Sequence, residues 1–136
     1  MKPVTSILET AIYAADIAAA AQFYRDVLGL TVVRQVDGSF VFLRCGRQML
    51  LVFNPDAAAR ADPANPIPRH GAHGPGHVCF RAADADEVAA WRDHFVRLGL
   101  QVEHDHLWPD GARSVYIRDP AGNSVEVGEA RMWGLD

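Results

Sequence analysis

The sequence predicts an α+β fold built from two βαβββ modules, because one pattern of elements occurs twice along the chain. In each half, a residue able to bind a metal begins a β-like run, and a helix-capping aspartate follows seven residues later. Glu9 and Asp16 hold these positions in the first half, and His77 and Asp84 hold them in the second. The tripeptide Leu-Gly-Leu then follows each helical stretch.

The first module is predicted to start with a strand over residues 7–14, in which apolar and polar side chains alternate. A helix over residues 17–28 follows, with Asp16 as its N-cap and an apolar stripe at helical spacing. Gly29 stands where a left-handed C-terminal glycine is favoured. Three β-like runs complete the module: residues 30–36, 39–44 and 48–53.

A connection rich in proline and glycine joins the two modules. Residues 54–76 contain five of the eight prolines and three glycines. We therefore expect a single domain, with module 1 at about residues 5–55, a linker at 56–74 and module 2 at about 75–130. Residues 56–61 are expected to form one helical turn, and the linker as a whole is expected to be mobile.

The second module repeats the order of the first. Residues 77–81 are predicted to form a strand, and Asp84 with Glu87 resembles a capping box at the start of a helix. The helix carries an apolar stripe of Val88, Trp91, Phe95 and Leu98. His104 and His106 are expected in a solvated turn. Residues 114–118 and 124–127 flank the sequence Asp-Pro-Ala-Gly-Asn and are predicted to form a hairpin.

Bulk composition excludes several classes of function. The net charge of −4 and the scattered basic residues argue against nucleic-acid binding and an anionic membrane surface. No apolar run approaches the roughly 20 residues of a membrane-spanning helix, and no signal peptide is expected. Cys45 and Cys79 are too few for a disulfide framework, so a reduced, cytoplasmic protein is expected.

Three side chains are candidate metal ligands: Glu9, His77 and Glu126. Strand alternation places Glu126 on the face opposite Val125 and Val127, and it places His77 on the corresponding face of its own strand. Two carboxylates and one imidazole suit a divalent ion such as Zn, Ni, Mn, Co or Fe(II). Each residue taken alone also fits a solvated strand face; their repeat-related positions favour a site.

Other residues are candidates for substrate binding. Tyr116 and Arg113 lie near the strand of Glu126, and Arg113 is a possible clamp for an anionic substrate. Both also fit ordinary stabilisation of a hairpin. His73 in the linker is a further candidate, and it also fits a plain loop residue.

The chain resembles the vicinal oxygen chelate superfamily, which includes glyoxalase I, thiol transferases of fosfomycin resistance, extradiol dioxygenases and bleomycin-binding proteins. The matching stretches are residues 16–17 with 23–30, residues 76–80 and residues 116–126. The resemblance implies paired modules that form a cupped mixed sheet, with helices on the outer face, around a divalent metal. Its metal positions correspond to Glu9, His77 and Glu126.

The resemblance also implies a homodimer, in which many small relatives take the equivalent of Glu9 from one subunit and the other ligands from its partner. Two departures stand out. Relatives often have His or Gln where this chain has Glu9, and the fourth ligand position of glyoxalase I falls at Leu50 or Leu51, which are apolar.

We therefore expect a metal-dependent enzyme that acts on a small oxygen-chelating substrate, as a glyoxalase-like lyase or isomerase or as a thiol transferase. Glu9 or Glu126 would double as a base. Two alternatives stay open: a sequestering protein without turnover and an extradiol dioxygenase-like oxygenase.

Overall fold

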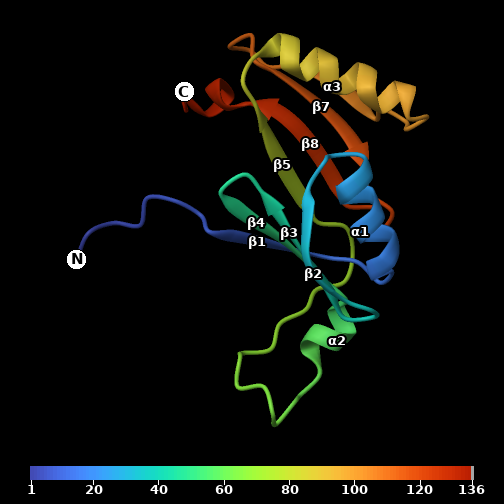
Figure 1. The fold of residues 1–136 in the computed structure, drawn as a ribbon. Helices are drawn as coiled ribbons and strands as arrows, with labels where there is room; N and C mark the ends of the chain where they lie inside the picture. Colours follow the sequence, from blue (N-terminus) through green and yellow to red (C-terminus); the bar gives the residue numbers. More distant parts are fainter. Residues whose placement is uncertain (136) are drawn as a thin grey trace. The chain divides into compact units, whose positions relative to one another are not determined.

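The computed structural model describes residues 1–135 (Figure 1). The chain divides into two compact units, one before and one after the boundary between residues 74 and 75. Each unit contains one four-stranded sheet and one long helix. The two units repeat the order strand, helix and three strands, which confirms the predicted βαβββ modules.

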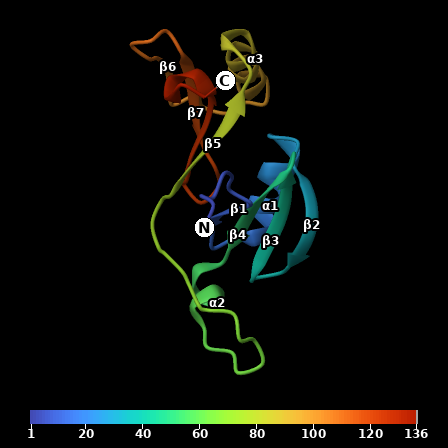
Figure 2. The same ribbon diagram turned by 90° about the vertical axis from the view of Figure 1, so that its left-hand side faces the viewer.

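The N-terminal unit contains β1 (Glu9–Tyr13), α1 (Ile17–Asp26), β2 (Thr31–Val36), β3 (Phe40–Cys45) and β4 (Gln48–Phe53). Its sheet has the order β1-β4-β3-β2, in which β1 and β4 are parallel and the other pairs are antiparallel. α1 covers one face of this sheet (Figure 2). The sheet contributes Val41, Leu43, Leu50 and Val52 to the buried core under the helix.

The C-terminal unit contains β5 (His77–Ala82), α3 (Ala85–Arg97), β6 (His104–Leu107), β7 (Arg113–Arg118) and β8 (Ser124–Glu129). A short 3₁₀ helix, Ala130–Trp133, follows. The sheet order is β5-β8-β7-β6, again with one parallel pair, β5 and β8. Figure 1 shows α3 along one face of this sheet, where it buries Val88 and Phe95.

Alternation along β7 and β8 divides the second sheet into an apolar face and a polar face. Val115, Ile117, Val125 and Val127 are at most 1% exposed and form the core with α3. The intervening side chains on these strands therefore lie on the face away from the helix. Burying such apolar side chains contributes about 1.5–3 kcal/mol each to folding, so this core fixes which residues reach the opposite face.

The helix starts follow the predicted capping chemistry. The Asp16 carboxylate accepts a hydrogen bond from the Ala19 amide at 3.0 Å, and the Asp84 carboxylate accepts one from the Glu87 amide at 2.8 Å. The return half of the capping box differs from the usual pattern, because the Glu87 side chain accepts from the amide of Ala83, one residue before the cap. Both helices start where the sequence predicts.

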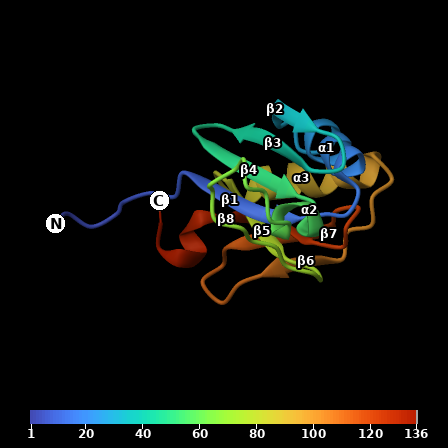
Figure 3. The ribbon, with the colours of Figure 1, turned by 90° about the horizontal axis from the view of Figure 1, so that it is seen from below.

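The segment after β4 belongs to the N-terminal unit and is anchored at several points. It starts with α2 (Pro55–Ala59), which follows β4 in Figure 3 and is capped by Asn54. The Tyr13 hydroxyl lies 2.8 Å from Nδ1 of His70, and His73 Nε2 lies 2.9 Å from Asp56 Oδ1. Long-range contacts to β1 and α2 therefore hold this connection.

Two local expectations are wrong. His104 and His106 lie on strand β6 and not in a turn, because β6 pairs with β7 through backbone hydrogen bonds that a polar sequence can also form. Leu98 is 49% exposed and leaves the apolar stripe of α3, because it is the C-cap residue, where the helical periodicity ends.

No helix within residues 1–135 is long and apolar enough to cross a membrane.

Candidate metal centre

His77 and Glu126 lie together on the polar face of the second sheet. Nε2 of His77 is 3.3 Å from Oε2 of Glu126. In the parallel β5–β8 pair, His77 is opposite Ser124 and Cys79 is opposite Glu126, so His77 and Glu126 are diagonal neighbours. The structure thus brings together two of the three predicted metal ligands.

The hydrogen bond made by Nδ1 of His77 determines whether Nε2, the nitrogen that faces Glu126, carries a proton when the ring is neutral. Nδ1 of His77 lies 3.1 Å from the Ser124 carbonyl oxygen, which can only accept a hydrogen bond. Nδ1 is therefore the protonated nitrogen, and Nε2 of the neutral ring presents a lone pair. A lone pair and a carboxylate oxygen then face each other, an arrangement that a cation between them stabilises.

The second carboxylate oxygen of Glu126 is buried and unpaired. Glu126 is 4% exposed, and its Oε1 has no hydrogen-bond partner among residues 1–135. Gly128 leaves room for this oxygen, because a Cβ atom at position 128 would lie 3.0 Å from Oε1 and 2.7 Å from Ser114 Oγ. A buried acceptor without a donor is costly, and a bound cation would remove that cost.

Cys79 and Tyr116 flank Glu126 on the neighbouring strands, each directly opposite it. Burial and the adjacent Glu126 carboxylate raise the pKa of the Cys79 thiol to about 12. Burial and the neighbouring Glu126 carboxylate raise the pKa of the Tyr116 hydroxyl to about 12 as well. Both groups are therefore neutral near pH 7.

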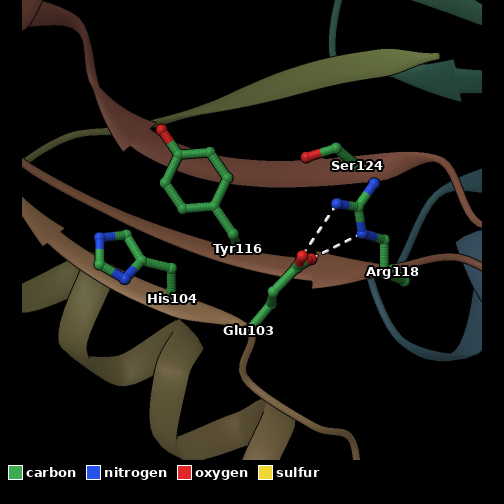
Figure 4. Close-up of a pocket in the computed structure, with 5 residues that line it drawn as sticks. All are labelled: Glu103, His104, Tyr116, Arg118 and Ser124. Atoms are coloured by element: carbon green, nitrogen blue, oxygen red, sulfur yellow. Dashed lines mark hydrogen bonds and ion pairs between the residues drawn. The ribbon is translucent and has the colours of Figure 1, made fainter. Parts of the chain in front are cut away.

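A shallow pocket of about 190 Å³ lies beside this centre, lined by Glu103, His104, Tyr116, Arg118 and Ser124 (Figure 4). The Arg118 guanidinium binds both carboxylate oxygens of Glu103, at 2.6 and 2.9 Å. This hydrogen bond lowers the pKa of Glu103. The pocket is therefore lined by a neutralised ion pair and by the aromatic rings of Tyr116 and His104.

The remaining predicted site residues lie elsewhere. Glu9 is the exposed first residue of β1 in the N-terminal unit, opposite Met49. His73 is in the same unit and pairs with Asp56. Arg113 contacts Asp105, with both N–O distances at 2.9 Å, and alternation places it on the opposite face of β7 from Tyr116.

Partial burial acts to raise the pKa of Asp105, but hydrogen bonds from Arg113 and Arg92 outweigh it and hold that pKa below its usual range. The guanidinium of Arg113 is thus engaged by a carboxylate of its own unit, and the structure does not bring it to Glu126.

Within residues 1–135, no three His, Cys, Asp or Glu side chains are grouped as a complete metal site. The donors that are present nevertheless fit a divalent ion in part. An imidazole with a free Nε2, a carboxylate oxygen 3.3 Å away and an unpaired buried Oε1 are suitable ligands for Zn²⁺, Ni²⁺ or Fe²⁺. A third protein ligand would have to join them.

Sequence reasoning missed Cys79, His104 and Ser124 as neighbours of this centre. The period-2 alternation of β5 and β8 places Cys79 and Ser124 on the same face as His77 and Glu126, and this was the signal available. Prediction of His104 as a neighbour would have required the knowledge that residues 104–107 form a strand paired with β7, in which His104 is opposite Tyr116.

Two βαβββ units, with a histidine and a glutamate close together across the parallel strands of one sheet, define a paired-module protein with a candidate metal centre on that sheet. The chain belongs to the Glyoxalase/Bleomycin resistance protein/Dioxygenase superfamily, whose family model matches residues 6–127. This confirms the family that the sequence motifs indicate.

Solved structures support the assignment. The chain is 59% identical to a structure described as lactoylglutathione lyase from Agrobacterium tumefaciens, with a TM-score of 0.97 and coverage of 98% of this chain and 100% of that chain. An integron cassette protein from the mobile metagenome of V. cholerae matches with a TM-score of 0.71, 22% identity and coverage of 96% and 98%, a likeness in fold alone.

A catechol-2,3-dioxygenase of Bacillus subtilis (strain 168) is 26% identical over 109 residues, which are 78% of this chain and 35% of that protein. The chain therefore spans about a third of the length of this relative.

Proposed function

We propose that the protein is a metal-dependent lyase or isomerase of the glyoxalase type, acting on a small molecule that carries two neighbouring oxygen atoms. The observation that supports it most directly is the opposition of two acceptors, His77 Nε2 and Glu126 Oε2, 3.3 Å apart. The Ser124 carbonyl fixes the proton on Nδ1 of His77, so only a cation or an additional proton can make this contact attractive.

Glu9 is the third ligand of the proposed centre. It occupies the position in β1 that His77 occupies in β5, since each is the first residue of the strand that pairs in parallel within its sheet. The position equivalent to Glu126 in the first unit is Leu51, opposite Ala11, which cannot bind a metal. We propose a homodimer in which Glu9 of one chain or of its partner completes the three-ligand set.

A divalent ion bound there would act as a Lewis acid that polarises a substrate oxygen. Oε2 of Glu126 would lie beside His77 at the ion. Oε1, which is buried and unpaired, would serve as a proton acceptor. Tyr116 stays protonated and can donate a hydrogen bond to an oxygen that gains negative charge. Glu9 is the second candidate base, and His73 remains a candidate for substrate binding.

The 59% identity to a protein described as a lactoylglutathione lyase favours a thioester of glutathione as product. Formation of such a thioester from an α-hydroxy thioether moves a proton between adjacent carbons, which requires a base next to a polarised oxygen. The exposed rim of the centre, with its Glu103–Arg118 ion pair, offers hydrogen-bond partners to a peptide-like group.

The proposal is tested by the formation of lactoylglutathione from methylglyoxal and glutathione, with protein stripped of metal and reloaded with Zn²⁺, Ni²⁺, Mn²⁺, Co²⁺ or Fe²⁺. Activity should depend on the added ion and disappear in His77→Ala and Glu126→Ala. Asp93→Asn, which changes an exposed carboxylate on α3, is the matched control and should keep activity. Product formation by the stripped protein, or by Glu126→Ala, would contradict the proposal.

The dioxygenase relative favours a second candidate, ring cleavage of a catechol with Fe²⁺, for which oxygen uptake is the assay. Two carboxylates and one histidine differ from the two histidines and one carboxylate common among Fe²⁺ oxygenases. Binding of substrate without any product would instead indicate a sequestering protein.

A further inference from the structure

We propose that His104 and His106 form a second divalent-cation site, separate from the His77–Glu126 centre and selective for ions that favour imidazole, such as Cu²⁺, Ni²⁺ and Zn²⁺. Both residues lie on β6, two positions apart, so their side chains leave the same face of the strand. Nε2 of His104 lies 3.1 Å from Nδ1 of His106. One nitrogen atom of each imidazole therefore faces the other ring.

The separation of these nitrogens is that of two ligands on one ion. Two nitrogens each about 2.0–2.1 Å from a metal are about 2.8–3.4 Å apart at ligand angles between square and tetrahedral. The distance of 3.1 Å lies within this interval. Exchange of the shared hydrogen for a cation keeps this separation and requires each ring to rotate by about 35–45°, so that its lone pair aims at the ion.

Neighbouring aromatic rings hold both imidazoles in place. The His106 ring meets Trp108 edge to face, with centroids 4.5 Å apart, and the Trp108 indole donates to Ser114 Oγ at 2.9 Å. The His104 ring lies beside Tyr116, the residue opposite it on β7, with centroids 6.3 Å apart (Figure 4). Such restraint lowers the entropy lost on binding an ion.

The pair is a separate site by position and by chemistry. β6 is two strands away from β8, about 10 Å at the usual strand spacing. The carboxylates next to the pair in sequence are both engaged: Arg118 binds both oxygens of Glu103, and Arg92 and Arg113 bind Asp105. The site thus offers two neutral ligands, and water completes the coordination of the ion.

Ion binding also requires a shift of one proton within a ring. In the hydrogen-bonded pair one imidazole donates and the other accepts. The donor ring moves its proton to its second nitrogen, and both facing nitrogens then coordinate as neutral imidazoles. Because Cu²⁺ binds nitrogen ligands most tightly in the divalent series, it is the most sensitive probe.

The experiment titrates CuCl₂ into the double variant His77→Ala/Glu126→Ala, so that the first centre does not compete. Trp108 fluorescence reports binding, because this indole touches His106, and Trp108→Phe identifies its share of the quenching. Electron paramagnetic resonance of the bound Cu²⁺ counts the coordinated nitrogens. Added His104→Ala and His106→Ala changes test the pair, and His94→Ala on α3 is the matched histidine control.

One Cu²⁺ should bind with two imidazole nitrogens, and either alanine change should weaken binding by at least the roughly 10- to 100-fold that loss of a supporting residue costs a metal site. His94→Ala should leave the affinity unchanged. Equal affinity in His104→Ala, or an equal loss in His94→Ala, would overturn the proposal. His104 is exposed, so His104→Ala decides the outcome even if His106→Ala fails to fold.

Discussion

His77 Nε2 and Glu126 Oε2 are 3.3 Å apart, although the His77 side chain is 53% exposed and the Glu126 side chain is 5% exposed. The pair therefore joins an accessible ligand to a sheltered one. A metal ion or substrate would therefore reach the pair from the side of His77. Glu126 is held in place by the strands on either side of β8, which are β5 and β7.

Glu9 should contribute to metal affinity. Glu9→Gln should weaken binding and Glu9→Ala should weaken it further, because each removes a negative charge that helps neutralise the cation. Glu9 is exposed, so the fold should remain intact, and the metal-free variant should be slightly more stable because repulsion between two carboxylates is relieved. Thermal melting of metal-free and metal-loaded forms measures both effects. An unchanged metal-induced shift in Tm for Glu9→Ala would show that Glu9 is only a solvated strand residue.

Cys79 should become more reactive in Glu126→Gln. Partial burial raises the pKa of Cys79 to about 12, together with the Glu126 carboxylate, which repels a thiolate beside it. A neutral amide removes that repulsion, so the pKa falls and the thiolate fraction rises about tenfold for each unit at mildly alkaline pH. The rate of alkylation by iodoacetamide, followed by mass spectrometry, measures this change.

Cys45 provides the internal control for this measurement, because burial alone raises the pKa of its thiol. Its rate should be the same in both proteins. A Cys79 rate that stays constant, or a parallel rise at Cys45, would argue against the influence of Glu126.

Gly128→Ala should impair the centre without replacing any of its proposed ligands. The new methyl group would lie 2.7 Å from Ser114 Oγ and 3.0 Å from Glu126 Oε1, so the carboxylate must move. We expect a loss of metal affinity of about tenfold and a cost of about 1–3 kcal/mol in the free energy of unfolding. Metal titration and denaturant unfolding measure the two effects. Gly76→Ala is the control, because its methyl group would meet Asn123 Oδ1 at an ordinary 3.4 Å; an equal effect of both changes would contradict this explanation.

The fold was predictable where local chemistry determines it. Asp16 and Asp84 cap their helices through their own carboxylates, and Gly29 and Gly99 end them with φ of +71° and +74°. Each depends on a few adjacent residues. Strand alternation likewise placed Glu126 opposite the core valines.

Contacts between strands were not predictable in the same way. The burial of Glu126 to 4% exposure depends on its neighbours across the sheet, Cys79 on β5 and Tyr116 on β7, neither of which is adjacent to it in sequence. Strand β6, with the sequence His-Asp-His-Leu, carries no apolar alternation, so its pairing with β7 had no sequence signal. Prediction of the ion pair between Arg113 and Asp105 would have required the same strand register.

The segment 56–74 should act as a flap that the Tyr13–His70 contact fastens. Tyr13→Phe removes the hydroxyl that lies 2.8 Å from His70 Nδ1, so trypsin should cut at Arg60 and Arg69 faster than in the wild type. Addition of ZnCl₂ with glutathione should slow these cuts if the segment closes over the site. First cleavage outside 56–74, or rates that neither the substitution nor the added compounds alter, would contradict the flap.

The most direct test of the central claim is the metal content of the protein purified without a chelating tag, measured by elemental mass spectrometry for the wild type, His77→Ala, Glu126→Ala and Asp93→Asn. We predict about one divalent ion per chain in the wild type and Asp93→Asn, and a large loss in the other two, with far-ultraviolet circular dichroism unchanged in all four. Removal of Glu126 should not unfold the chain, because its neighbours Val125 and Val127 form the core on the opposite face. Full metal occupancy in Glu126→Ala or His77→Ala would contradict the proposed centre.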